Sequence, residues 1–306
     1  MTAAGHRRDR RERGFIIVAV LWILLALATL ASIYAAYVVR TADAVGTSDR
    51  QVRAQALFTA AVEMTAYELS ATPKDARPAT GRFDFRLGRV GALVAFQSEA
   101  GRIDLNAAQK PLLTSLFTAL GARPADAESY ADRVIAWRSE APRTGGDDAE
   151  AAAYQTAGLA YAPRHAPFQD VGELWLVLGL PPPLVERALP YVTVFSGAEQ
   201  VNVLAAPPLV IAALPGVTPE QVNSVLAARR SAALDPQAVL AALGPTARAA
   251  ATVTAGAAVR VSVDVRLDDG SRATADVVIL LADDGPEPYR ILSWRDDFDQ
   301  FAPAGG

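Results

Sequence analysis

The sequence lacks cysteine and has few of the other residues on which catalysis usually depends. Without cysteine no disulfide can form, so the stability of the protein must come from packing alone. There are two histidines, His6 and His165, and the only lysines are Lys74 and Lys110. No serine, histidine and aspartate triad, zinc site or phosphate-binding loop can be assembled from this set. We therefore predict that the protein is not an enzyme, and we expect His165 to lie in a surface loop without a catalytic role.

Positive charge is concentrated at the N-terminus. The chain of 306 residues has a formal charge of −4, although five of its arginines fall within residues 7–13. A mature chain without that segment would be more acidic still. Because nucleic-acid binding depends on positive charge, this balance argues against nucleic acid as a partner.

Charge is absent from residues 15–39, which follow the basic segment directly at the step Gly14-Phe15. A helix of this length rises about 37 Å at about 1.5 Å per residue, enough to cross a bilayer. The positive-inside rule places its N-terminus in the cytoplasm and the bulk of the chain beyond the inner membrane, in the periplasm. Since Gly14-Phe15 stands at the cytoplasmic edge of the apolar segment, it has the form of a prepilin cleavage site. The alternative is an ordinary uncleaved membrane anchor.

Beyond the apolar segment, the pattern predicts that the same helix continues to about residue 70. Apolar spacings of three and four residues define one face of it, formed by Ala54, Phe58, Ala61, Thr65 and Leu69.

Alternating residues predict strands at 83–87 and 91–96 and, near the other end of the chain, at 259–267, 273–281 and 289–294. Turns are predicted at 268–270 and 283–285. Residues 106–250, between the two strand regions, have an alanine-rich helical pattern. This order predicts an α+β fold in which a long N-terminal helix packs on an antiparallel sheet that is interrupted by a large helical insertion.

The insertion contains a weak internal repeat. Residues 103–108, Ile-Asp-Leu-Asn-Ala-Ala, resemble residues 201–206, Val-Asn-Val-Leu-Ala-Ala, and two helical runs follow each segment. The copies end at Trp137-Arg138 and Ala228-Arg229. Both look like helix–hairpin–helix units of the SAM-like type. The second hairpin contains two prolines, which have no N–H to offer to phosphate, so we interpret the units as protein-contact modules.

Together these features resemble the K-class minor pseudopilins of type II secretion systems (general secretion pathway protein K). Besides the Gly14-Phe15 junction, the likeness rests on the segments 99–106, 146–150, 171–174 and 189–193. The resemblance implies five parts. They are a prepilin leader at 1–14, a transmembrane helix at 15–39, a pilin-like α+β domain at 40–103 and 251–306, and SAM-like domains at 104–198 and 199–250.

The resemblance also implies a function. It implies a minor pseudopilin at the tip of the pseudopilus, which initiates or caps assembly with I- and J-class minor pseudopilins to support protein export across the outer membrane. Other pseudopilins, inner-membrane secretion components and prepilin peptidase are the further partners that it implies. The peptidase would cut between Gly14 and Phe15, and Phe15 would become N-methylated.

One departure from the relatives concerns the fifth position after the cut, where most pilins have glutamate and this chain has Ala19. An unpaired charge near the bilayer centre costs about 2.5–3.5 kcal/mol, so the glutamate of the relatives needs a partner, thought to be a neighbour's N-terminal amine. Ala19 offers no carboxylate to a subunit already in place. We therefore expect the chain to be the first subunit, at the tip.

The resemblance further implies a loop that can bind calcium. The carboxylates available there are Glu140, Asp147, Asp148 and Glu150, whereas calcium takes about six to eight oxygen ligands. No Asp-x-Asp-x-Asp-Gly loop is present. Two interpretations stay open, a calcium site formed partly by these residues and a solvated acidic loop.

Trp137 and Trp175 fall in helical stretches, so we expect both to fill the core, and exposure of either would instead indicate a contact surface. Two alternative functions also fit the sequence. One is a minor pilin-like subunit of another type IV filament system, against which the tandem SAM-like units argue. The other is a membrane-anchored periplasmic adaptor that keeps its leader.

Overall fold

The computed structural model describes residues 8–88, 90–140, 148–231, 234–282 and 287–297. The chain divides into two compact units, residues 1–56 and 57–306. The predicted turn at 283–285 and the end of the pilin-like domain at 298–306 lie outside the described residues.

The first unit is formed by the greater part of helix α1 (Arg8–Ser70). Within α1, Ile17–Val38 is long and apolar enough to cross a membrane, and its side chains are exposed. The described part of the chain has no other such segment. A single N-terminal helix therefore has the properties of a single-pass membrane anchor.

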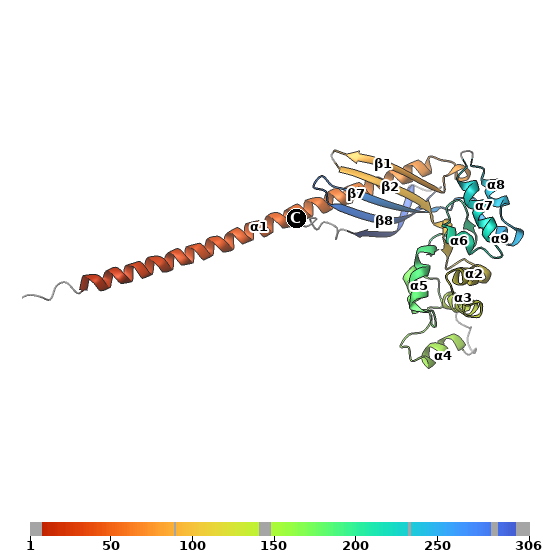
Figure 1. Cartoon of the computed structure of the whole chain (residues 1–306), viewed down its shortest axis with the longest axis horizontal. Helices are drawn as coiled ribbons and strands as arrows, with labels where there is room; N and C mark the ends of the chain where they lie inside the picture. Colours follow the sequence, from red (N-terminus) through yellow and green to blue (C-terminus); the bar gives the residue numbers. More distant parts are fainter. Residues whose placement is uncertain (1–7, 89, 141–147, 232–233, 283–286, 298–306) are drawn as a thin grey trace, which may run out of the picture. The chain divides into compact units, whose positions relative to one another are not determined.

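The second unit joins the end of α1 to a five-stranded antiparallel sheet (Figure 1). The strands are β1 (Thr80–Leu87), β2 (Val90–Ser98), β7 (Ala258–Arg266), β8 (Arg272–Leu281) and β9 (Tyr289–Asp297). Their order is β1-β2-β7-β8-β9, and a short 3-10 helix, η1 (Lys74–Ala76), precedes β1.

The predicted apolar face of the long helix is confirmed, because Phe58, Ala61, Thr65 and Leu69 are all buried, as is Ala54 in the first unit. On the facing side of the sheet, alternate residues of β2 and β7, such as Val94 and Val263, are buried as well. The α+β architecture follows from these two periodicities, about 3.6 residues in the helix and 2 in the strands.

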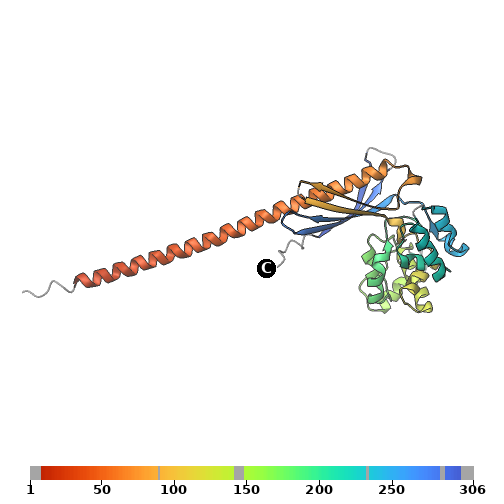
Figure 2. The ribbon, with the colours of Figure 1, turned by 45° about the horizontal axis from the view of Figure 1, so that its top comes forward.

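The insertion leaves the sheet between β2 and β7, which are hydrogen-bonded neighbours (Figures 1 and 2). After η2 (Glu99–Gly101), its first half runs from β3 (Ile103–Asp104) to β4 (Val192–Thr193). Between them come α2 (Lys110–Ala119), α3 (Pro124–Arg138), α4 (Ala149–Thr156), η3 (Val171–Leu176), α5 (Pro182–Ala188) and η4 (Leu189–Tyr191).

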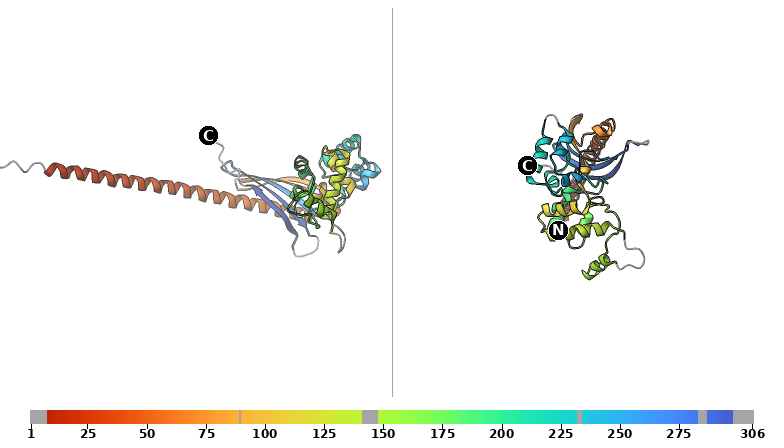
Figure 3. Two further views of the ribbon diagram at one scale, coloured as in Figure 1. Left: turned by 90° about the horizontal axis from the view of Figure 1, so that it is seen from below. Right: turned by 90° about the vertical axis from the view of Figure 1, so that its right-hand side faces the viewer.

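The second half also begins and ends with a two-residue strand, and the helices of both halves lie at the same end of the sheet (Figure 3). It runs from β5 (Val201–Asn202) through α6 (Pro208–Ala212), α7 (Pro219–Arg229), α8 (Pro236–Ala241) and α9 (Pro245–Ala249) to β6 (Ala251–Thr252). Most of these helices begin at a proline, whose missing N–H is not needed in the first turn. Each half is closed by a parallel two-residue ladder, β3 with β4 and β5 with β6, and the two halves share one hydrophobic core.

Two sequence expectations need correction. Trp137 is buried as predicted, but the prediction that Trp175 fills the core is wrong, because its side chain is 47% exposed on η3. A 3-10 helix of this kind places successive side chains on different sides, so Leu174 is buried while Trp175 and Leu176 face outward. The sequence also gave no sign of strands β3 to β6, since two residues cannot show an alternating pattern.

Candidate functional site

The predicted processing site lies near the start of the chain. Gly14 and Phe15 fall within the bounds of α1, but their side chains are outside the described residues. Ala19 is described and lies in the first turn of the membrane-length segment Ile17–Val38. The cut between Gly14 and Phe15 and the methylation of Phe15 stay predictions.

The repeat seen in the sequence becomes a repeated structure at Asp104 and Asn202, which are both buried. One oxygen of Asp104 accepts hydrogen bonds from the backbone N–H groups of Asn106 and Ala107, at 2.7 and 3.2 Å. At the equivalent place, Asn202 Oδ1 accepts from the Leu204 N–H at 2.8 Å. In each copy the side chain thus holds the turn that leads from the strand to the first helix.

The second contact of each side chain reaches the far end of its own unit. The other Asp104 oxygen accepts from the Ser196 hydroxyl at 3.0 Å and the Gly197 N–H at 2.8 Å. The Asn202 amide instead donates to the Thr254 carbonyl at 2.8 Å. In each unit these hydrogen bonds therefore join the segment where the chain enters to the segment where it leaves.

An arginine at the end of the second helix completes each copy. Arg138 donates to the carbonyls of Leu105 and Ala108, at 2.5 and 2.7 Å. Arg229 donates to the Ala206 carbonyl at 2.6 Å. Burial lowers the pKa of both guanidinium groups, which shows that the two cations are partly removed from water.

We expect Arg138→Ala to lower the free energy of unfolding by about 3 kcal/mol and Arg229→Ala by about 1.5 kcal/mol. A hydrogen bond to a charged group contributes about 1.5–3 kcal/mol, and Arg138 makes two such bonds where Arg229 makes one. Urea denaturation of the full chain in detergent micelles, followed by circular dichroism, measures both. The control is the exposed Arg230, whose replacement by alanine should change stability by less than about 0.5 kcal/mol. Equal losses for all three arginines would contradict the structural role.

A buried ionic group connects the insertion to the sheet. Glu99 of η2 is 1% exposed and lies 2.6 Å from the guanidinium of Arg260 on β7. The second oxygen of Glu99 accepts a hydrogen bond from the Thr193 hydroxyl of β4. Arg260 also forms an ion pair with Asp276 of β8, at 3.2 Å. Burial disfavours the charged form of Arg260, but the two carboxylates outweigh it and raise its pKa. The charged pair therefore fixes the base of the first unit to the sheet.

Two of the four predicted calcium residues, Asp148 and Glu150, contact basic side chains. Glu140 is exposed, and Asp147 lies outside the described residues. Asp148 caps α4 by accepting a hydrogen bond from the Ala151 N–H, and its other oxygen lies 2.9 Å from His165 Nε2. The hydrogen bond from Ala151 and the nearby His165 ring both lower the pKa of the Asp148 carboxyl. Glu150 pairs with Arg133 at 2.9 Å. The described residues contain no group of three metal-binding side chains, and calcium binding stays a prediction of the resemblance.

His165 lies in a loop, as predicted, but its ring is half-buried against α3 and α4. Nδ1 is 3.1 Å from the Ser139 carbonyl, and the backbone has a φ of 53°. Its neighbour in this loop, Arg164, donates to Glu173 at 2.8 Å. The loop before η3 is thus attached to the end of α3 through polar contacts.

Residues 90–197, from β2 through β4, match the family model for the type II secretion system protein K. The matched segment includes α2 to α5 of the insertion, and in this segment the chain is similar to protein K. No curated protein matches it by sequence.

Among solved structures, the chain is similar to a chain of the GspK-GspI-GspJ complex from the type 2 secretion system of enterotoxigenic Escherichia coli. The TM-score is 0.61 at 19% identity, and the similarity covers 82% of this chain and 99% of the other. At that identity the likeness establishes the fold alone. The α+β class and the helical insertion expected from the sequence are therefore confirmed.

Sequence reasoning missed one cluster in the helical insertion. Glu173 accepts hydrogen bonds from the Trp137 indole at 3.0 Å, from Arg164 and from the Gln169 N–H at 3.1 Å. Burial raises the pKa of Glu173, but these three donors outweigh it and leave the pKa below its ordinary value of 4.5. The segment 171–174 contributed to the resemblance without revealing that its glutamate bonds to Trp137.

The lowered pKa predicts a stability that depends on pH. Because the folded state binds a proton on Glu173 less tightly than the unfolded state does, this contribution is present above pH 4.5 and is lost as the pH falls through the folded pKa. Glu173→Gln should therefore flatten the acid side of the stability curve, measured by urea denaturation from about pH 6 to pH 3. Glu186→Gln, at an exposed position on α5, should leave the slope unchanged. A slope that is identical in the Glu173 variant and the wild type would contradict the assignment.

Proposed function

We propose that this chain is a member of the protein K family and the minor pseudopilin at the tip of the type II secretion pseudopilus. There it initiates or caps assembly with I- and J-class minor pseudopilins, and its work is assembly instead of catalysis. The solved relative is a complex of GspK with GspI and GspJ, which supports these two partner classes. Other pseudopilins and inner-membrane secretion components are the further partners of the assembled filament.

The observation that carries the tip position is Ala19. It lies at the start of the membrane-length segment, where it is half-buried and has no carboxylate. A subunit without this carboxylate cannot pair with the N-terminal amine of a subunit already in place, so it joins the filament before the others. The insertion between β2 and β7 adds bulk to one end of the sheet (Figure 2), which supports a subunit with no neighbour above it.

The proposal includes the biogenesis of the protein. α1 enters the inner membrane with its arginine-rich end in the cytoplasm and the second unit in the periplasm. Prepilin peptidase removes residues 1–14, and Phe15 is methylated. The uncharged length from Ile17 to Val38 supports this arrangement.

Immunogold electron microscopy tests the tip position. The full chain is expressed in its native host together with an excess of the major pseudopilin, and antibodies to the second unit are applied to sheared filaments. Gold at one end of each filament is expected. Gold distributed along the filaments would contradict the tip position, and filaments of another type IV system labelled in the same way would favour that alternative.

A further inference from the structure

One face of α4 attaches this helix to α3. Glu150 and Tyr154 are four residues apart, so they lie on the same face of α4. Tyr154 is buried with its ring centre 6.2 Å from that of Trp137 on α3, and its hydroxyl accepts a hydrogen bond from the Leu178 N–H at 2.8 Å. One turn earlier, Arg133 of α3 pairs with Glu150 at 2.9 Å. The ion pair therefore lies where the two helices meet.

The Arg133–Glu150 pair is partly shielded from water. The exposed fraction is 31% for the Arg133 side chain and 21% for the Glu150 side chain. Glu150 also lies in the first turn of α4, where the positive end of the helix dipole favours a carboxylate. Arg133 and the helix together thus neutralise Glu150 without a further cation.

Both oxygens of Asp148 also have contacts within the chain. One oxygen caps α4 by accepting a hydrogen bond from the Ala151 N–H, at 2.9 Å. The other lies 2.9 Å from His165 Nε2, and the opposite ring nitrogen of His165 lies 3.1 Å from the carbonyl of Ser139, which ends α3. His165 therefore connects the cap of α4 to the end of α3.

A calcium ion at these carboxylates would conflict with the contacts that they already make. Calcium takes about six to eight oxygen ligands at about 2.3–2.6 Å. In the part of the chain that the structure describes, no three acidic or histidine side chains come close enough to hold an ion. An ion bound to Glu150 would also lie beside the Arg133 guanidinium, and like charges repel. The described carboxylates therefore do not fit calcium unless their present contacts break.

We propose that Arg133 and His165 take the place of a calcium ion in this chain, so that α4 is held on α3 by protein side chains and needs no metal. Arg133 neutralises Glu150, and His165 contacts the Asp148 oxygen that the helix cap leaves free. The acidic residues that suggested a calcium loop then act as a helix cap and an ion-pair partner. The proposal does not depend on the position of the chain in a filament.

Hydrogen exchange of the α4 amides, followed by mass spectrometry of the full chain in detergent micelles, tests the proposal. Exchange in residues 149–156 should be equally slow in millimolar calcium and in a calcium chelator. Because a partly exposed ion pair is worth at most about fivefold in an equilibrium constant, Arg133→Gln and Glu150→Gln should each speed this exchange about threefold to fivefold. His165→Asn should change it in the same direction, since asparagine tolerates the left-handed backbone at this position, where φ is 53°.

A charge reversal distinguishes an ion pair from a metal site. Arg133→Glu alone places two negative charges together, and Glu150→Arg alone places two positive charges together. Each single variant should therefore exchange faster at α4 than the wild type. The double variant restores opposite charges, so it should exchange more slowly than either single variant. A calcium site would not recover in the double variant, because arginine cannot bind the ion.

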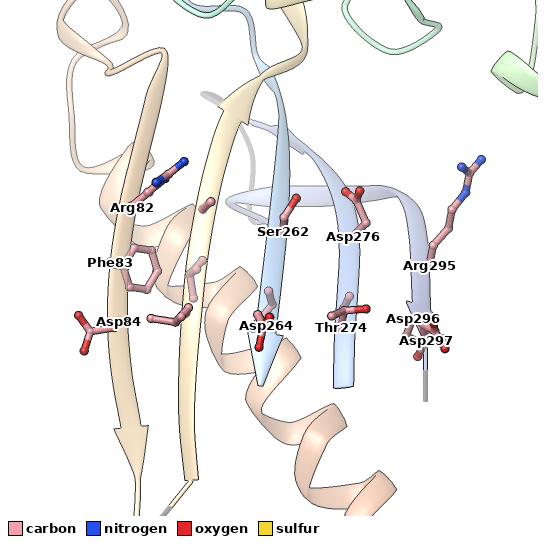
Figure 4. A pocket seen from close by; sticks show the side chains of 15 residues that line it. Arg82, Phe83, Asp84, Ser262, Asp264, Thr274, Asp276, Arg295, Asp296 and Asp297 are labelled. Atoms are coloured by element: carbon pink, nitrogen blue, oxygen red, sulfur yellow. The ribbon is translucent and has the colours of Figure 1, made fainter. Parts of the chain in front are cut away.

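Two control variants remove exposed carboxylates that have no part in this contact. Glu140→Gln alters another residue of the predicted calcium set, and Asp84→Asn alters β1 of the sheet (Figure 4). Neither should change exchange at α4. Calcium that slows this exchange, with reversal by the chelator, would overturn the proposal. So would equal effects of Glu140→Gln and Glu150→Gln, or a double variant that exchanges as fast as the single variants.

Discussion

Arg260→Ala is expected to lower the free energy of unfolding by about 3–5 kcal/mol, one of the two largest effects that we expect from a single substitution. Removing one partner of a buried ion pair leaves the other charge in a low-dielectric environment without compensation. Glu99 is almost fully inaccessible, and without Arg260 the side-chain hydrogen bond that it keeps is the one from the Thr193 hydroxyl. Urea denaturation of the full chain in micelles measures the loss.

Two further variants distinguish the effect of the unpaired charge from the effect of lost packing. Replacing the pair together, with Glu99→Gln and Arg260→Met, should recover most of the stability, because no unpaired charge remains. Arg260→Lys keeps the positive charge but loses the planar guanidinium that pairs with both Glu99 and Asp276. We therefore expect a loss of stability between those of Arg260→Ala and the double variant. If the double variant were less stable than Arg260→Ala, the destabilisation would have another cause than the buried charge.

Asp104→Ala should cost about 3–5 kcal/mol. The carboxylate accepts from three backbone N–H groups and the Ser196 hydroxyl, and each buried donor left without a partner costs about 1–3 kcal/mol. Some of these donors will find water, so the sum is not additive. The loss is measured in the same denaturation experiment.

The repeat supplies the matched control for Asp104. Asn202 shows that an asparagine fits this turn and accepts the N–H two residues on. In Asp104→Asn, however, the amide N–H₂ would face two donors, the Ser196 hydroxyl and the Gly197 N–H. We therefore expect a loss of about 1–2 kcal/mol, smaller than in the alanine variant. Equal losses in the two variants would show that the turn contacts contribute nothing.

The parts of the fold with a clear period could be predicted from the sequence. Phe58, Ala61, Thr65 and Leu69 recur at helical spacing and are buried in the second unit. The alternation in β7 predicted that Val261 and Val263 face the core. The repeat was also visible, because residues 103–108 and 201–206 share small and apolar residues at the same places.

The contacts that hold the insertion could not be predicted in the same way. The copies were seen to end at Arg138 and Arg229, but nothing local shows which carbonyls these arginines reach, since their partners lie more than twenty residues away. Trp175 was misplaced because a 3-10 helix does not follow the spacing of an α-helix. The order of the sheet depends on strand register, which pairs β2 of the first strand region with β7 of the second.

The central claim is that the chain is made and used as a pseudopilin, and the mass of its N-terminal peptide tests this most directly. The protein is isolated from its native host with and without functional prepilin peptidase, digested and analysed by mass spectrometry. The account predicts a peptide that begins at methylated Phe15 when the peptidase is present and at the original N-terminus when it is absent. A leader that stays attached in both strains would contradict the account and leave a permanently anchored adaptor.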